Sequence, residues 1–281
     1  MFETGEEKLC VDARPARGIE VQIGGLAPER DGAHPTDDIG VPSRRILGVR
    51  VDCLDMKAAL ELISRLAGLP GPVRTIATVN PEFVMSARTD AQVRTALEQT
   101  EICLADGIGV VWALRRRGCP FATRVAGSDL VPQLISLCAD RGWAVFLLGA
   151  GPGVADLAAA RLLERNPNLT IAGTHSGAPA PEQDEESTRL INASRARVLL
   201  VAYGHPAQEL WIQRNRARLQ VSIAMGVGGT LDFISGQVLR APGVWRRMNL
   251  EWLWRLLLQP WRASRMMALP RFALLVLLNR S

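Results

Sequence analysis

Apolar and polar residues alternate along most of the chain in two different ways. Short apolar and β-branched runs, typical of buried strands, lie at 46–52, 73–80, 101–105, 143–150, 169–177, 196–204 and 221–229. Between them apolar residues recur at helical spacing, which predicts helices at 55–67, 81–99, 106–118, 128–142, 152–167, 182–194 and 206–219. Strands that alternate with helices predict an α/β fold, with a mostly parallel sheet and helices on both of its faces.

The two ends of the chain depart from this alternation. Residues 1–43 are polar, contain four prolines and show no periodicity, so they are predicted to form a disordered leader before an α/β core at 44–240. Residues 241–281 are predicted to form a basic helical appendage rich in Arg and Trp. Its last apolar run, 272–278, is shorter than the roughly 18 residues that a membrane-spanning helix needs.

Charge separates the C-terminal end from the rest of the chain. Residues 240–281 hold eight arginines and one acid, a net charge of +7, whereas the whole chain carries +5. Four of the seven tryptophans lie in the same segment. Arg, Trp and Leu interleaved at helical spacing are typical of a helix on an anionic membrane surface. Packing on the core and homo-oligomerisation stay open, and nucleic-acid binding is not expected, since no known nucleic-acid module is present.

Composition narrows the class of protein. Hydrophobic residues make up 48% and charged residues 22%, which excludes global disorder, a collagen and a disulfide scaffold. The first ten residues carry three Glu and no apolar stretch, so no signal peptide is expected and the protein is predicted to be cytoplasmic. The five cysteines form no CxxC pair and are predicted to be reduced thiols. The three histidines show no ligand spacing, so no metal site and no cofactor are expected.

In a parallel sheet, ligands bind outside the carboxyl ends of the strands. This rule selects five segments, at 78–80, 106–109, 149–153, 204–209 and 226–232. The pattern leaves two roles open for Asp106, which can cap the following helix or act as a general base. Residues 226–242 combine four glycines with an acid and an arginine, which suggests a backbone that lies against a ligand.

The loop at 149–153 invites comparison with a dinucleotide-binding motif. Its glycines stand at 149, 151 and 153, but Val154 occupies the position where G-x-G-x-x-G requires glycine, and no acid ends the next strand. A tight strand-to-helix turn therefore explains these glycines better than an NAD site, while a phosphate contact at the helix N-terminus stays open. Two alternative functions stay open. The glycine loop allows an NAD-linked sugar-modifying oxidoreductase, and the basic C-terminal segment allows a non-catalytic membrane-associated scaffold.

Seven motifs are specific when taken in order, although each is weak by itself. They are TVNPEF (78–83), ADGIGVV (105–111), RVAGSDL (124–130), VFLLGAGPGVA (145–155), YGHPAQE (203–209), GVGGTLDFISGQVLRAP (226–242) and NLEWLWRLLLQPWR (249–262). Over residues 45–265 the chain resembles the WecG/TagA/CpsF family of bacterial glycosyltransferases. The resemblance implies a Rossmann-like fold of the GT-E type. It also implies inverting transfer, commonly β-1,4, from a UDP-sugar to a polyprenyl-diphosphate-linked saccharide in cell-surface or exopolysaccharide synthesis.

The resemblance also assigns roles to individual residues. It implies that Asp106 is the general base and that the catalytic group further includes Thr78, Asn80 and Arg240. The residues it implies for substrate binding are Arg124, Gly127, Asp129, Gly149, Gly204, Gln208, Glu209, Gly228 and Asp232. Three candidates for a tail arginine that closes over the diphosphate are Arg246, Arg247 and Arg255. The chain departs from the family at Ala207, where a lysine is common, so a phosphate contact at that position is in doubt.

Elementary chemistry agrees with these roles. An inverting transfer needs a base for the acceptor hydroxyl and positive charge for the departing diphosphate. The chain contains no D-x-D sequence, a common divalent-metal clamp of sugar transferases, so arginines are expected to supply the charge without a metal. An arginine on a membrane-binding appendage would place this charge where a lipid-linked diphosphate lies, with the enzyme peripheral on the inner face of the plasma membrane.

Overall fold

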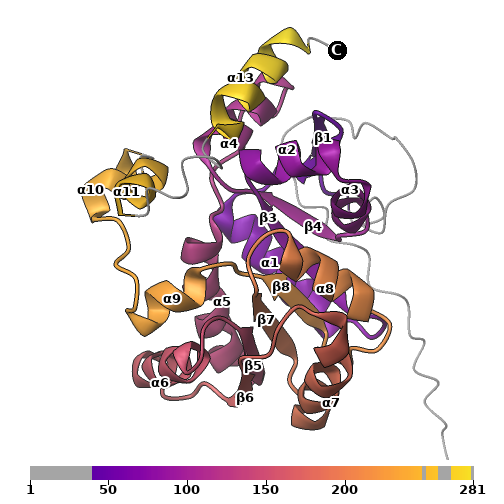
Figure 1. Ribbon diagram of the computed structural model, residues 1–281, viewed down its shortest axis with the longest axis vertical. Helices are drawn as coiled ribbons and strands as arrows, with labels where there is room; N and C mark the ends of the chain where they lie inside the picture. Colours follow the sequence, from indigo (N-terminus) through magenta and orange to yellow (C-terminus); the bar gives the residue numbers. More distant parts are fainter. Residues whose placement is uncertain (1–39, 249–250, 259–266, 280–281) are drawn as a thin grey trace, which may run out of the picture.

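The sheet of the protein contains six parallel strands. The structure, a computed structural model, describes residues 40–248, 251–258 and 267–279 (Figure 1). The strand order is β4-β3-β8-β7-β5-β6, and the bounds are β3 (Arg74–Val79), β4 (Ile102–Ala105), β5 (Val145–Gly149), β6 (Ile171–His175), β7 (Val198–Ala202) and β8 (Ile223–Gly226). The predicted α/β class and parallel sheet are confirmed. Residues 1–39, most of the predicted leader, lie outside the described residues.

Helices cover both faces of this sheet, as predicted. Successive strand residues point to opposite faces, so Leu147 packs with α1 (Met56–Gly68), α5 (Gly127–Arg141), α6 (Val154–Arg165) and α9 (Thr230–Ser235). Leu148 packs on the other face with α7 (Asp184–Ser194) and α8 (Ala207–Asn215). The second face continues over β3 and β4 with α2 (Pro81–Thr89), α3 (Ala91–Glu98) and α4 (Ile108–Arg116). Both faces of each central strand are therefore buried, which explains their nearly unbroken apolar sequences.

Local signals explain several helix boundaries. Asp55 caps α1, its side chain accepting a hydrogen bond from the backbone N–H of Ala58 at 2.8 Å, and aspartate is a favoured residue at this position. The segment at 81–99, predicted as one or two helices, is two helices, because Asp90 ends α2 and caps α3. Helix α9 was not predicted, since its six residues are too few to show a periodic pattern.

The first predicted strand, 46–52, is wrong as a single element. It is a hairpin of β1 (Ser43–Ile46) and β2 (Val49–Asp52), which pair antiparallel in a separate two-stranded sheet. Leu47 and Gly48 make the turn with φ values of 51° and 92°, as in the turns that match the twist of a hairpin. Leucine rarely adopts such a φ, so the sequence contains no recognisable turn signal at this point.

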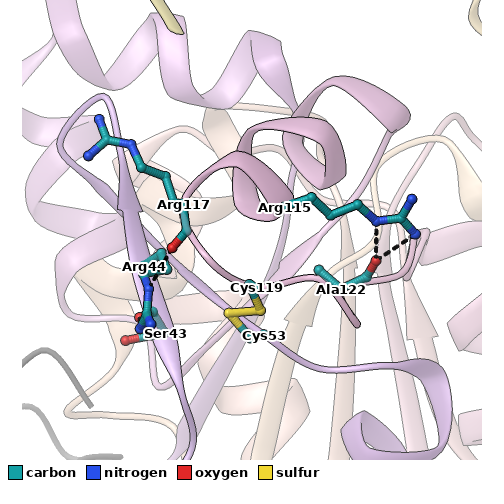
Figure 2. The surroundings of a disulfide bond; sticks show 7 residues. All are labelled: Ser43, Arg44, Cys53, Arg115, Arg117, Cys119 and Ala122. Atoms are coloured by element: carbon teal, nitrogen blue, oxygen red, sulfur yellow. Dashed lines mark hydrogen bonds between the residues drawn. A yellow bond between two sulfur atoms is a disulfide. The ribbon is translucent and has the colours of Figure 1, made fainter. Parts of the chain in front are cut away.

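Two of the cysteines are joined in a disulfide. Cys53, just after β2, is bonded to Cys119, just after α4 (Figure 2). The prediction of reduced thiols is therefore wrong for this pair. It is confirmed for Cys103 and Cys138, which are free and buried; burial raises the pKa of each thiol to about 12. Cys10 lies outside the described residues.

The C-terminal helices divide between two places in the molecule. Helix α13 (Ala268–Leu278) packs Phe272 and Val276 into the cluster formed with α2 and α4, at the top of Figure 1. Helices α10 (Gly243–Arg247) and α11 (Glu251–Leu258) follow α9 on another side of the molecule. None of the helices in the described ranges combines the length and the apolar character needed to cross a membrane.

Candidate active site

A pocket of about 440 Å³ opens at the carboxyl ends of four adjacent strands, β4, β3, β8 and β7. The loops that follow these strands line it, together with the start of α5 and the first residues of α11. After β3 the chain continues to β4, at one edge of the sheet. On the other side of β3 lie β8 and then β7, which follow β5 and β6 in the chain, and β6 forms the opposite edge. Such a reversal of direction leaves a crevice between neighbouring loops.

The loop after β3 contributes Thr78 and Asn80. Asn80 is held by its position as the cap of α2, where its Oδ1 accepts a hydrogen bond from the N–H of Phe83 at 3.1 Å. Thr78 lies beside the start of α5, and a Cβ on Gly127 would stand 3.4 Å from its Oγ1. That distance is an ordinary van der Waals contact, so the start of α5 lies close to the end of β3.

The loop after β4 contributes Asp106. Its backbone N–H donates to the carbonyl of Val79 at 2.8 Å, which continues the pairing of β4 with β3 beyond the strand. The N-cap of α4 is Gly107, whose φ of 94° suits glycine. Of the two roles that the pattern left open for Asp106, the cap position therefore belongs to its neighbour. The carboxylate of Asp106 lies at the pocket.

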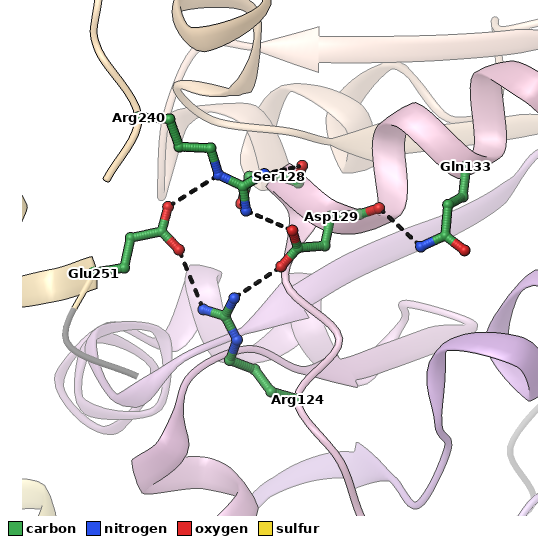
Figure 3. A network of polar contacts seen from close by, with 6 residues as sticks. All are labelled: Arg124, Ser128, Asp129, Gln133, Arg240 and Glu251. Atoms are coloured by element: carbon green, nitrogen blue, oxygen red, sulfur yellow. Dashed lines mark hydrogen bonds and ion pairs between the residues drawn. The ribbon is translucent and has the colours of Figure 1, made fainter. Parts of the chain in front are cut away.

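A ring of four charged side chains borders the pocket (Figure 3). Arg124 donates to Asp129 at 2.8 Å and to Glu251 at 3.4 Å. Arg240 donates to the other oxygen of Asp129 at 2.6 Å and to the other oxygen of Glu251 at 3.3 Å. Burial by itself would lower the pKa of Arg240, but its bonds and charge interactions with Asp129 and Glu251 outweigh burial and raise that pKa. The ring joins α5 to α11 through alternating charges.

A second polar chain lies under the opposite wall, between the loops after β7 and β8. The N–H of Gly228 donates to Gln208 Oε1 at 2.9 Å, and Gln208 Nε2 donates to Glu209 Oε1 at 2.7 Å. The remaining oxygen of Glu209 lies 3.0 Å from His205 Nδ1. Gln208, Glu209 and the His205 side chain are almost fully buried, so this chain is a fixed part of the wall.

The sequence of the chain matches one family model. The model is that of the glycosyl transferase WecG/TagA/CpsF family, and it matches residues 44–281. The chain belongs to this family. It is therefore a glycosyltransferase of the WecG/TagA/CpsF type, and the pocket at the strand ends is its candidate active site.

Most of the residues expected to bind substrate in this WecG/TagA/CpsF protein come together at the pocket. Those that line it are Thr78, Asn80, Asp106, Arg124, Gly127, Gly204, Gln208, Gly228 and Asp232. Asp129, Glu209 and Arg240 lie directly behind the lining, bonded to residues that form it. Arg246 and Arg247 belong to α10 and Arg255 to α11, but their side chains lie outside the described part of the structure.

Gly149 lies outside the lining of the WecG/TagA/CpsF pocket. Its φ is 93°, and a Cβ there would stand 2.9 Å from the backbone of Ala202 and from the ring of Tyr203. The glycine thus permits β5 to pack tightly against the end of β7. The tight-turn interpretation of the loop at 149–153 agrees with this geometry.

Sequence reasoning missed several residues that line the pocket, among them Phe83, His205, Glu251 and Trp252. His205 stands inside the YGHPAQE motif, and a histidine at a strand end was a signal that could have been used. Glu251 is the third residue of the NLEWLWRLLLQPWR motif, from which only Arg255 had been considered for the site. Within the described residues, no group of three or more His, Cys, Asp or Glu side chains is arranged to hold a metal ion.

Proposed function

We propose that this glycosyltransferase transfers a sugar from a UDP-sugar to a polyprenyl-diphosphate-linked saccharide in cell-surface or exopolysaccharide synthesis, with inversion and a β-1,4 linkage. The observation that carries the proposal is that Asp106, Arg124 and two helix N-termini meet in one pocket. A carboxylate that takes a proton and donors that receive a diphosphate are the two requirements of such a transfer.

Backbone N–H groups at the pocket support a diphosphate site. Helices α4 and α5 both begin at the pocket, and neither has a side-chain hydrogen bond at its N-cap. The first N–H groups of a helix have no partner within it and carry a partial positive charge. Phosphate oxygens are preferred ligands of such N–H groups. Arg124, which lies between α4 and α5 in the sequence, adds a full positive charge.

The transfer itself would use Asp106 as base. Its carboxylate takes the proton of the acceptor hydroxyl while that oxygen forms a bond to the anomeric carbon of the donor. On the opposite side of this carbon the bond to the diphosphate oxygen breaks, and UDP leaves with the electron pair, so configuration is inverted. Arg124, Arg240 and the helix N-termini stabilise the charge that develops on UDP, which needs no metal ion.

In the proposed complex, the arginines of the ring of charges bind the diphosphate while they stay bonded to the acids of the ring. Arg124 and Arg240 are held in place by Asp129 and Glu251, so their positions are set before a ligand binds. Bidentate guanidinium groups suit phosphate oxygens. Among the tail arginines, Arg246, Arg247 and Arg255 are proposed to add further charge, because α11 already reaches the pocket through Glu251 and Trp252.

We further propose that residues 241–281 form an appendage that holds the enzyme on the anionic inner face of the plasma membrane. Large apolar side chains are exposed on the described part of this segment: Val244, Met248, Trp252, Leu257, Met267, Leu274, Leu277 and Leu278. Together with the excess of arginine, they suit a surface-bound helical segment. A lipid-linked acceptor would then meet the pocket at the membrane.

A donor screen tests the proposed function. Full-length protein is incubated with a panel of UDP-sugars and a short-chain polyprenyl-diphosphate acceptor ending in GlcNAc or glucose, with and without EDTA, and UDP release is measured. We expect acceptor-dependent release from one donor that survives EDTA. Loss of release in EDTA would contradict the metal-free mechanism. Calorimetry with UDP and with NAD on the same sample is expected to detect binding of UDP, and a protein that binds NAD instead would refute the proposal.

A further inference from the structure

His205 lines the pocket, but the proposed mechanism assigns no role to it. It follows β7, and its ring stacks on Phe83 with centroids 3.6 Å apart and an interplanar angle of 20°. Its side chain is 8% exposed. Stacking on one face and a carboxylate at one edge fix both the position and the rotation of the imidazole.

The polar chain of the wall also fixes which ring nitrogen carries hydrogen. The N–H of Gly228 binds Gln208 Oε1, so the NH₂ end of that amide faces Glu209. The Glu209 carboxylate accepts this hydrogen bond at one oxygen and lies 3.0 Å from His205 Nδ1 at the other. Because a carboxylate accepts and does not donate, Nδ1 carries the hydrogen, as in carboxylate–histidine pairs that orient an imidazole for function.

The other ring nitrogen, Nε2, is buried and has no hydrogen-bond partner among the described residues. A buried polar atom left unpaired is destabilising, so such an atom at a binding site calls for a ligand. With Nδ1–H directed at Glu209, a neutral ring offers a lone pair at Nε2. A sugar hydroxyl can donate to that lone pair, whereas a fully ionised diphosphate has no hydrogen to donate.

The side chains that line the pocket suit the same kind of ligand. Among the pocket-lining residues that the structure describes, Glu82, Asp106, Asp232 and Glu251 carry carboxylates, which accept hydrogen bonds from hydroxyl groups. Arg124 lines the pocket as well and is paired with Asp129 and Glu251. The aromatic ring of Phe83 beside His205 adds an apolar surface. Hydroxyl donors and an apolar face are both features of a saccharide.

We infer that His205 is a specificity-determining residue of the transfer. Its Nε2 accepts a hydrogen bond from a hydroxyl group of the bound saccharide, and Glu209 holds the tautomer that makes this possible. The inference rests on the proposed function, because it adds a saccharide contact to that site. The bond forms when the saccharide fills the pocket, since hydrogen bonds of this kind tighten on binding.

Two substitutions at position 205 separate a saccharide contact from a structural role. In H205N the amide replaces Nδ1 and keeps a donor for Glu209, but nothing stands at the place of Nε2. In H205Q the amide oxygen reaches the place of Nε2, but the donor for Glu209 is lost. A third variant, E209Q, keeps the ring; its amide nitrogen can donate to Nδ1, which moves the ring hydrogen to Nε2.

The kinetic constants of these variants are compared by using the donor and acceptor identified in the screen. We expect H205N and E209Q to lower kcat/KM about tenfold or more through a higher KM for the saccharide substrate, because a hydrogen bond from a buried partner is lost. H205Q is expected to stay within about threefold of wild type. The affinity for UDP, measured by calorimetry, should be unchanged in H205N and H205Q. A kcat/KM for H205N equal to wild type, or one for H205Q below that of H205N, would overturn the inference.

His175 supplies the matched control. It ends β6, its Nε2 is also buried without a partner among the described residues, and it does not line the pocket. H175N should therefore leave kcat/KM unchanged, and melting curves of all variants confirm that they are folded. A wild-type protein that neither binds nor releases UDP would refute the proposed function itself. Normal wild-type turnover that H205N does not alter would refute the role of His205 while the proposed function stands.

Discussion

Asp106 is the residue on which the proposed chemistry depends most directly. Replacing it by asparagine keeps its size and removes the proton acceptor at the end of β4. We expect Asp106→Asn to lower kcat about 100-fold or more, the usual contribution of a general base, with no change in UDP affinity. Steady-state turnover assays measure kcat, and calorimetry measures the affinity for UDP. Asp140→Asn, at the exposed C-terminal end of α5, is the control; a D106N enzyme as fast as this control would exclude Asp106 as the base.

Gly226 lies at the end of β8 and leaves room for the polar chain beneath the pocket wall. A Cβ there would stand 2.5 Å from Gln208 Nε2 and 2.8 Å from Glu209 Oε1. Both groups are buried and hydrogen-bonded, so Gly226→Ala must break one of their bonds. We expect kcat/KM to fall about tenfold and the free energy of unfolding by about 1–3 kcal/mol. Gly68→Ala, where nothing lies within 4 Å, should change neither; wild-type kinetics in G226A would show that the polar chain tolerates displacement.

Individual site residues were predictable from the sequence to different degrees. Thr78, Asn80 and Asp106 follow directly from the rule that ligands bind at the carboxyl ends of parallel strands. The same rule selects the segment 204–209 that contains His205 but gives no role to its side chain, and Glu251 lies outside every selected segment. The surroundings of both residues come from far away in the chain: Phe83 stacks on His205, and Arg124 binds Glu251. Contacts of this range leave no periodic trace in a sequence.

At the scale of elements, Asp184 ties α7 to α8. Its two oxygens accept hydrogen bonds from Arg214 at 2.5 and 2.8 Å. Burial alone would raise the pKa of Asp184, but the bonds and charge of Arg214 outweigh burial and lower it. A lowered carboxyl pKa adds stability above the unfolded value of about 3.9, and this stability is lost as the pH falls through the folded pKa.

Asp184→Asn is therefore expected to lower Tm by about 2–6 °C at pH 7, allowing for screening at the partly exposed Arg214. The difference from wild type should begin to shrink as the pH falls below about 3.9, the unfolded value, and continue to shrink toward the lowered folded pKa. Melting curves from pH 3 to pH 8 measure it. Glu185→Gln, at an exposed neighbouring position, is the control, and a Tm difference that persists unchanged at pH 3 would contradict the role of this ion pair.

Elements were predicted well where their burial determines their sequence. The central strands of the main sheet are apolar on both faces, and all six strands were found. The hairpin of β1 and β2 was read as one strand, because all four residues of β2 are buried and the turn at Leu47 contains no favoured turn residue before Gly48. Helix α9, which contacts α5 and α6, was missed because its six residues are too few to show a periodic pattern.

At the scale of the whole molecule, one face of α13 is buried against the core and another is exposed. Phe272 and Val276 are buried against the core, whereas Leu274, Leu277 and Leu278 are exposed by 57%, 47% and 71%. We expect replacement of Leu274 and Leu277 by serine to weaken binding to anionic phospholipid vesicles about threefold or more, since each apolar side chain removed from the interface loses transfer energy. Tm should not change. Co-sedimentation with vesicles measures the binding.

The control for this experiment is another pair of exposed leucines, Leu157 and Leu163 on α6. Figure 1 shows α6 at the far end of the molecule from α13. Their replacement by serine should leave vesicle binding unchanged. Equal loss in both double variants would indicate non-specific adsorption, and no loss in either would exclude α13 from the membrane contact.

The strand order has a consequence for how the protein is made. β3 is the first strand of the main sheet to be synthesised, yet one of its neighbours is β8, whose Ile223 pairs with Arg74 across 149 residues of sequence. At a ribosomal rate of about 5–20 residues per second, β3 waits roughly 7–30 s for this partner. During that interval an apolar strand edge is open to association with other chains. Because the pocket needs the loop after β8, a nascent chain acquires its candidate active site only as the last strand of the sheet is added.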